Sequence, residues 1–95
     1  MGLVKMNELI GVFFREKPIM ILLSLKNSKT NNMYASLISK EVDCTYSHVV
    51  KVLKEFEKND LISFRSDGRL KYIKLEDKGK EIASEFEKLI TIINN

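Results

Sequence analysis

The chain has 95 residues, enough for one domain with a modest core, and its 44% hydrophobic and 31% charged residues are typical of a globular protein in water. No apolar run approaches the ~18 residues of a membrane-spanning helix, and the first residues lack the pattern of a secretion signal, so we expect a cytoplasmic protein without membrane contact. One cysteine and one histidine exclude an intrachain disulfide and a structural zinc site, and we expect no metal or cofactor.

The net charge of +3 is modest, but the charges are unevenly distributed along the chain. Residues 45–75 carry seven Lys or Arg (Lys51, Lys54, Lys58, Arg65, Arg69, Lys71, Lys74) and four Asp or Glu. Residues 76–95 carry only three Lys and five Asp or Glu. A polyanion that contacts only the middle of the chain is consistent with this distribution.

The N-terminal third predicts two helical segments. Residues 1–16 carry Leu9, Ile10, Phe13 and Phe14 at helix-like spacing, which predicts a short amphipathic helix or an extended arm. So many apolar groups must cover something, either the domain's own core or a partner subunit. An apolar helix over residues 18–25 follows, with Pro18 in its first turn, and then a polar loop over residues 26–32.

Two helices separated by a tight turn come next. Apolar residues at helical spacing predict one helix over residues 34–42 and another over residues 45–59. The second helix has an apolar face formed by Val49, Val52, Leu53 and Phe56, and Thr45 can cap its N-terminus. Its opposite face is polar and cationic, which suits the base edges and thymine methyl groups of the DNA major groove. This pattern predicts a helix-turn-helix over residues 34–59.

Residues 61–75 change to a period of two. Ile62 and Phe64 alternate in the first half, and Leu70, Tyr72 and Lys74 alternate in the second. The Asp-Gly pair at 67–68 between two alternating runs is the strongest short-range signal of a β-hairpin.

Residues 77–93 predict a final helix. Ile82, Phe86, Leu89 and Ile93 follow a 4-3-4 spacing, which is the seam of a short coiled coil. We therefore expect these four residues to form a dimerisation surface.

The order of helix, helix, turn, helix, basic hairpin and helix resembles the winged helix-turn-helix family, and most closely the small archaeal and bacterial transcription regulators of the MarR-like and ArsR-like kind. The likeness is carried by residues 38–62 (ISKEVDCTYSHVVKVLKEFEKNDLI) and 65–79 (RSDGRLKYIKLEDKG). It implies an α+β, mostly α fold in a single winged-helix domain over residues 1–95, with a three-helix core, a β-hairpin wing and a C-terminal dimerisation helix. Two positions depart from the family pattern, Asp43 for Gly in the turn and Glu76 for Thr before the last helix, so we expect Asp77 to cap that helix.

Carried onto this sequence, the family's base-reading positions fall on Thr45, Tyr46, Ser47, Val50 and Lys51, with His48 alongside. Lys54 and Lys40 would hold phosphates without reading the bases. In the wing the candidates are Arg65, Arg69 and Lys71, of which Arg69 at the tip would enter the minor groove. Val50 is the apolar member of the set and suits a thymine methyl group.

Each of these residues also has a plainer interpretation. The polar helix face can be merely solvated, and cations on a hairpin can merely keep an edge strand soluble. Cys44 lies in the turn, where the family has a buried aliphatic residue, so we interpret it as a packing residue rather than a redox sensor.

The sequence predicts a homodimeric, sequence-specific regulator of transcription that binds double-stranded DNA. It is not expected to be an enzyme, because it lacks a second histidine, a Gly-rich phosphate loop and a His/Cys/Asp constellation. Two alternatives stay open: a winged-helix protein–protein module of a transcription or replication assembly, and an architectural protein that binds DNA without sequence preference. The sequence names no effector molecule.

Overall fold

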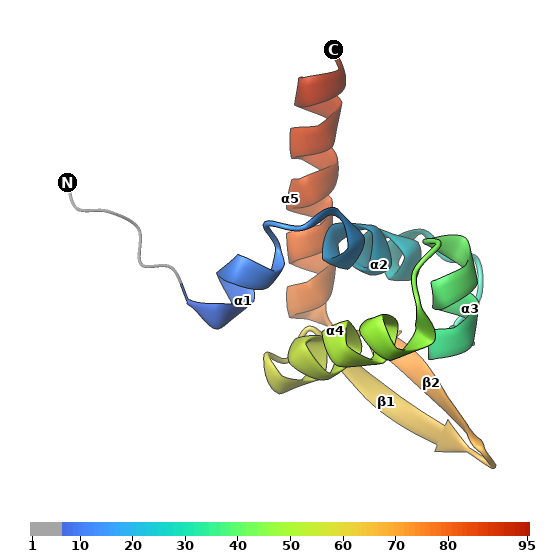
Figure 1. Cartoon of the computed structure of the whole chain (residues 1–95). Coiled ribbons are helices and arrows are strands. Elements are labelled where there is room, and N and C mark those ends of the chain that lie inside the picture. The colour runs from blue at the N-terminus through green and yellow to red at the C-terminus, as the bar shows by residue number, and fades with distance from the viewer. Residues whose placement is uncertain (1–6) are drawn as a thin grey trace.

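The computed structural model describes residues 7–95, which form a mostly helical body with a β-hairpin that projects from it (Figure 1). The elements in chain order are α1 (Glu8–Val12), α2 (Glu16–Asn27), α3 (Ala35–Glu41), α4 (Tyr46–Lys58), β1 (Ile62–Asp67), β2 (Leu70–Leu75) and α5 (Asp77–Asn94). This arrangement confirms the expected fold class, a winged helix-turn-helix. None of the helices in the described part of the chain has the length and apolar character to span a membrane.

The core lies where α2, α3 and α4 meet the base of the hairpin and the first turns of α5. Each element contributes fully buried side chains, including Ile21, Leu22, Ile38, Val49, Phe56, Leu61 and Ala83. The four apolar residues predicted for one face of the 45–59 helix, which is α4, are all buried. Because one face of α4 is buried, the residues on its opposite face point toward the solvent, as expected for an amphipathic helix with 3.6 residues per turn.

The turn between α3 and α4 has the features that the sequence predicts. Asp43 has φ +52°, a left-handed conformation that Asp tolerates better than most residues, so no glycine is needed there. The Thr45 hydroxyl accepts a hydrogen bond from the His48 backbone N–H at 3.3 Å and caps α4. The Lys17 ammonium donates to the Val42 carbonyl at 2.7 Å, which ties α2 to the end of α3.

The register of the hairpin shows that the prediction of Leu70, Tyr72 and Lys74 as the alternating, core-facing set of the second strand is wrong. Phe64 pairs with Ile73, and Ile62 pairs with Leu75, so Ile73 and not Tyr72 enters the core from β2. The cause is the two-residue loop: Gly68, with φ +63°, lets Asp67 pair with Leu70, and every later pair follows from that register. The Ile73 backbone N–H also donates to the Met33 carbonyl at 2.8 Å, which joins the wing to the segment before α3.

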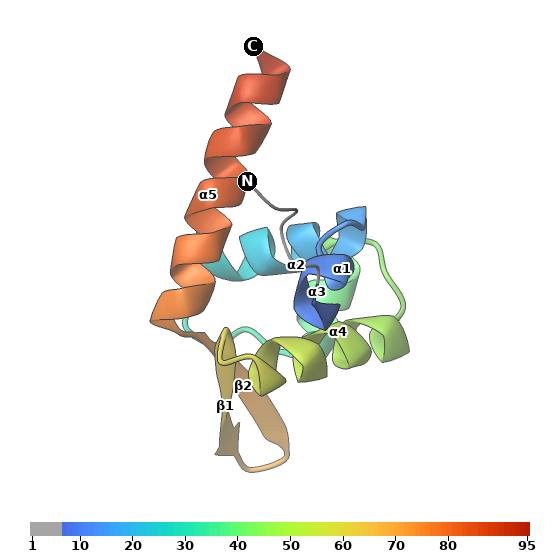
Figure 2. The same ribbon diagram turned by 90° about the vertical axis from the view of Figure 1, so that its left-hand side faces the viewer.

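Helix α5 crosses the body with its first half and projects beyond it with its second (Figures 1 and 2). Its N-cap residue is Glu76, without a side-chain cap, so the expected cap by Asp77 is wrong. The Glu76 carboxylate instead accepts a hydrogen bond from the Ser63 hydroxyl at 2.8 Å. Further along, the Lys26 ammonium lies 2.6 Å from the Glu87 carboxylate and links α5 to α2. This hydrogen bond, with another from Asn27, lowers the pKa of Glu87.

The N-terminal segment packs against the domain's own core. Helix α1 is short, and the Phe13 ring that follows it lies 5.5 Å from the Phe56 ring of α4 and 5.1 Å from the Phe86 ring of α5, measured between centroids. Phe14 points away and is 74% exposed. Residues 1–6 of the segment predicted as a helix or arm lie outside the described residues.

Candidate nucleic-acid interface

The outward face of α4 carries the residues that the sequence singles out. Ser47 and Lys51 are exposed, and Thr45 and Tyr46 are exposed at the N-terminal end of the helix. His48 and Val50 are half-buried at the two edges of this face. The base-reading set predicted from the sequence therefore lies on one surface, at and near the first two turns of α4.

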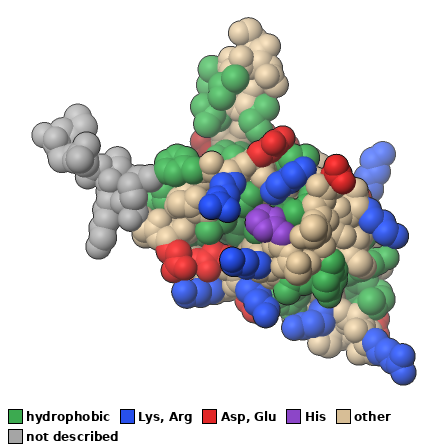
Figure 3. Space-filling model, viewed as in Figure 1, with side chains coloured by type: hydrophobic (Ala, Val, Ile, Leu, Met, Phe, Trp, Pro, Cys, Tyr) green, Lys and Arg blue, Asp and Glu red, His purple; other side chains and the backbone are tan. Residues whose placement is uncertain are grey.

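Cations surround this surface. Lys and Arg side chains gather over α4 and extend to the tip of the hairpin (Figure 3). Among residues 7–95, no carboxylate pairs with Lys51, Lys54, Arg69 or Lys71, whereas Lys58 pairs with Glu8 at 3.6 Å. Unpaired cations on one face give a positive potential that attracts polyanions such as nucleic acid.

A groove of about 270 Å³ runs between α4 and the wing. Its apolar lining comes from the start of α3, from α4 and from both strands of the wing, and its cations come from α4, β2 and the loop between the strands. The lining residues include Tyr34, Tyr46, Val50, Phe64 and Leu70, together with Lys54, Arg69 and Lys71. The groove brings together Tyr46, Val50 and Lys54 of the predicted helix residues with Arg69 and Lys71 of the predicted wing residues.

Arg65 does not join this groove. It pairs across the hairpin with Tyr72, and its guanidinium lies over the Tyr72 ring and donates to the Asn32 side-chain oxygen at 3.1 Å. Lys71, by contrast, lies over the Phe64 ring at 4.8 Å, on the groove side. The two cations therefore occupy opposite faces of the wing, because successive strand residues alternate between faces.

The site predicted from the sequence lacks several residues of the groove, among them the large apolar residues Tyr34, Phe64 and Leu70. The sequence spacing of the first two indicates only their secondary structure, a helix for Tyr34 and a strand for Phe64. Leu70 had a clearer signal. It directly follows the loop residues Gly68 and Arg69, so it lies at the tip of the hairpin, where exposure to solvent is expected.

The four residues predicted for dimerisation divide into two pairs. Ile82 and Phe86 are half-buried and pack against the domain's own core. Leu89 and Ile93 are 50% and 70% exposed on the projecting end of α5, beside Ile90 and Ile92. Only the second pair is available to a partner, and its role in dimerisation stays a prediction.

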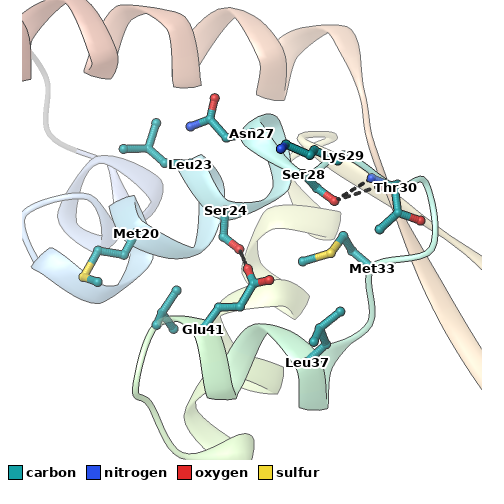
Figure 4. A pocket seen from close by; sticks show the side chains of 11 residues that line it. Met20, Leu23, Ser24, Asn27, Ser28, Lys29, Thr30, Met33, Leu37 and Glu41 are labelled. Carbon is teal, nitrogen blue, oxygen red and sulfur yellow. Dashed lines mark hydrogen bonds between the residues drawn. The ribbon is translucent and has the colours of Figure 1, made fainter.

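A second hollow lies between α2 and α3, on another side of α3 from the groove. Met20, Leu23 and Leu37 give it an apolar wall, and the Ser24 hydroxyl donates to the Glu41 carboxylate at 2.5 Å (Figure 4). Ser24 and Glu41 thus bind each other. Within residues 7–95 no group of His, Cys, Asp and Glu is suited to hold a metal ion.

None of the known protein-family models matches the chain. An uncharacterised protein of Archaeoglobus fulgidus is 32% identical to it over 91 residues, which make up 94% of this chain and 96% of that protein. The crystal structure of AF1382 from the same organism superposes with a TM-score of 0.82 at 32% identity, over 93% of this chain and 99% of AF1382. This chain belongs to the AF1382 family.

The AF1382 family shares its fold with known regulators. MepR, a transcription regulator of the Staphylococcus aureus multidrug efflux pump MepA, superposes with a TM-score of 0.76 at 22% identity, over 82% of this chain and 58% of MepR. MepR in complex with DNA gives a TM-score of 0.72 at 20% identity, over 85% of this chain and 68% of MepR. These values show the winged-helix fold of MarR-type regulators and confirm the resemblance seen in the sequence.

Proposed function

We propose that this protein is a homodimeric, sequence-specific regulator of transcription that binds double-stranded DNA in the cytoplasm. Helix α4 enters a major groove, where Ser47 and Lys51 face base edges, and the wing lies on the neighbouring minor groove or backbone with Arg69 at its tip. Lys40, Lys54 and Lys71 contact phosphates. The protein needs no cofactor and catalyses no reaction.

The observation that carries the proposal is the shared face of α4 and the wing. Lys51 and Lys54 lie on a helix whose opposite side is buried, and Arg69 and Lys71 lie on the wing beside it, with no carboxylate partner among the described residues. Leaving cations unpaired on one surface is favourable when a polyanion binds there and releases its counterions. The fold shared with MepR, which has been solved with DNA, supports this assignment.

The projecting end of α5 supports the proposed dimer. Leu89, Ile92 and Ile93 expose apolar surface at a helix end that the body does not cover. In a dimer formed through two such helices, the recognition helices would face half-sites about one helical turn (~34 Å) apart. The DNA site should therefore be palindromic.

Selection from a pool of random duplexes, followed by sequencing, tests this function. The expected result is a motif with two-fold symmetry whose half-sites are about 10 base pairs apart, centre to centre. A control selection with Lys51→Ala should lose or relax the motif, since that residue faces base edges. Retention of duplexes without any shared motif would indicate an architectural DNA-binding protein instead.

A protein–protein module is the second candidate, and one observation favours it. The groove between α4 and the wing exposes the apolar side chains of Tyr46 and Leu70, and aromatic residues such as tyrosine are enriched in surfaces that bind proteins. If this function is correct, Lys51→Ala and Arg69→Ala leave it intact, whereas Tyr46→Ala and Leu70→Ala abolish it. The DNA-binding proposal predicts that both pairs weaken binding to the selected duplex.

A further inference from the structure

The groove between α4 and the wing has a lining that phosphate binding alone does not explain. Tyr46 is 58% exposed and Leu70 is 43% exposed, and Val50, which lines the same groove, is half-buried. These apolar side chains lie next to Lys54 and Lys71, which is where a nucleic-acid strand would be held. Exposed apolar groups at such a position gain free energy only if the bound strand offers apolar surface to cover them.

Tyr46 and Val50 form an apolar strip along α4, and their positions on the helix show that the strip faces the wing. Val50 follows Tyr46 by one helical turn, on the flank of α4 that faces the wing, whereas Ser47 and Lys51 lie further round on the exposed front. Glu57, the acid in the groove, is about three turns from Tyr46 and so lies toward the other end. The N-terminal part of the groove is therefore both apolar and free of carboxylates among its lining residues.

In the major groove of DNA, the one apolar group that a base presents to a protein is the C5-methyl of thymine. We propose that the apolar strip of Tyr46 and Val50 binds a thymine methyl group in each half-site, and that this contact is a source of sequence specificity. Lys54 and Lys71 hold the phosphates of the same strand, and Leu70 covers the strand from the wing. The inference rests on the proposed DNA-binding function and adds the base that this groove reads.

Deoxyuridine substitution tests the inference, because it removes only the methyl group of thymine and leaves every hydrogen-bonding group in place. In the duplex obtained by selection, each thymine is replaced in turn, and the Kd is measured by fluorescence anisotropy at fixed salt. We expect one or two positions per half-site at which wild-type affinity falls about fourfold, the value for one buried methyl-sized group. Deoxyuridine in the flanks outside the half-sites serves as the control and should change nothing.

The protein side of the test uses Val50→Ala and Val50→Thr, and a half-buried site tolerates both. Val50→Thr keeps the branched shape and replaces one methyl by a hydroxyl group. Each variant should bind the thymine duplex more weakly than the wild type, by a similar factor. Both should distinguish thymine from deoxyuridine at the sensitive positions less well than the wild type does, because Tyr46 remains but the methyl contact of Val50 is reduced.

Three results would overturn the inference while the DNA-binding function stands. They are a selected motif without a thymine in its half-sites, wild-type affinity that no deoxyuridine changes, and a deoxyuridine effect that persists undiminished in both Val50 variants. A selection that returns no shared motif, or no bound duplex, is a different outcome: it overturns the proposed function itself and the inference with it.

Discussion

The guanidinium carbon of Arg65, on β1, lies 4.8 Å from the centre of the ring of Tyr72, the residue that pairs with Arg65 on β2. The same guanidinium donates a hydrogen bond to Asn32, in the loop before α3. Tyr72 in turn meets the Tyr34 ring edge-on, with centroids 6.2 Å apart. This chain of contacts fixes the wing to the segment before α3, from Arg65 and Tyr72 on the face of the wing opposite Lys71 to Tyr34 at the edge of the groove.

Arg65→Ala should therefore act on stability as well as on binding. An exposed cation–π contact contributes roughly 0.5–1 kcal/mol, so we expect the midpoint of thermal unfolding to fall by about 2–8 °C. Arg69→Ala, which removes an exposed tip residue, should leave the midpoint unchanged. If instead Arg65→Ala left the midpoint unchanged and reduced the salt dependence of DNA binding, Arg65 would contact DNA directly, as the sequence alone predicts.

Gly79 in the first turn of α5 should not tolerate alanine. A Cβ atom there would come within 3 Å of the Leu61 carbonyl oxygen and the Leu75 side chain, so α5 would have to shift on the hairpin. Although alanine in a helix interior is normally favoured over glycine by about 1 kcal/mol, we expect Gly79→Ala to lower the free energy of unfolding by roughly 1–3 kcal/mol.

Gly11→Ala is the matched control, since a Cβ at that position in α1 meets no atom within 4 Å. Urea denaturation should show it unchanged or slightly more stable than the wild type. Equal stability of Gly79→Ala and the wild type would contradict the close approach of α5 to the hairpin.

The projecting end of α5 should control the oligomeric state. Replacing Leu89 and Ile93 together by lysine should convert the proposed dimer to a monomer in sedimentation equilibrium, without destabilising the body, because both side chains are already exposed. Ile82→Ala should instead leave the oligomeric state unchanged and lower the free energy of unfolding by roughly 2–4 kcal/mol, because it removes core packing. A double variant that stays dimeric would place the dimer contact elsewhere.

The ion pair between Lys26 and Glu87 should make stability depend on acid pH. Hydrogen bonds from Lys26 and then Asn27 hold the pKa of Glu87 below its ordinary value of 4.5. A carboxylate whose pKa is lower in the folded state stabilises the fold above its unfolded-state pKa, and this contribution disappears as the pH falls through the folded-state value. The wild type should therefore unfold at a higher temperature than Glu87→Gln at pH 7, and the difference should shrink and then disappear as the pH falls below 4.5 and through the folded-state pKa of Glu87.

Glu81→Gln is the control for this measurement, because Glu81 is exposed on the same helix and has no ion pair among residues 7–95. It changes the net charge by the same amount without breaking a bond to α2. A pH dependence identical for the two variants would show that the bond to Lys26 contributes nothing.

The recognition helix could be predicted from sequence because its signals are local. The 3.6-residue period of Val49, Val52 and Phe56 identifies the buried face, and Thr45 identifies the start. The wing was predicted for the same reason, from Asp-Gly between alternating runs. The register of the wing was not predicted, although a two-residue loop determines it. This loop places Phe64 opposite Ile73, and the face on which Arg65 lies then follows.

The groove could not be predicted, because its lining residues are far apart in the sequence and come together only in the folded chain. Tyr34, Val50 and Leu70 come from three elements, and nothing local indicates that their side chains line one surface. The same holds for Phe86, whose coiled-coil spacing favoured a partner subunit, whereas its ring packs against Phe13 of its own chain. A heptad pattern identifies an apolar face but not what covers it.

The most direct test of DNA binding by α4 and the wing is affinity for a duplex as salt is raised, for the wild type and Arg69→Ala. Each phosphate contact contributes about −0.9 to the slope of log K against log salt, so the slope should be steep for the wild type and flatter by about one in the variant. Lys88→Ala, which removes the same charge from α5, should keep the wild-type slope. Absence of binding at low salt, or equal slopes for the wild type and Arg69→Ala, would contradict this account.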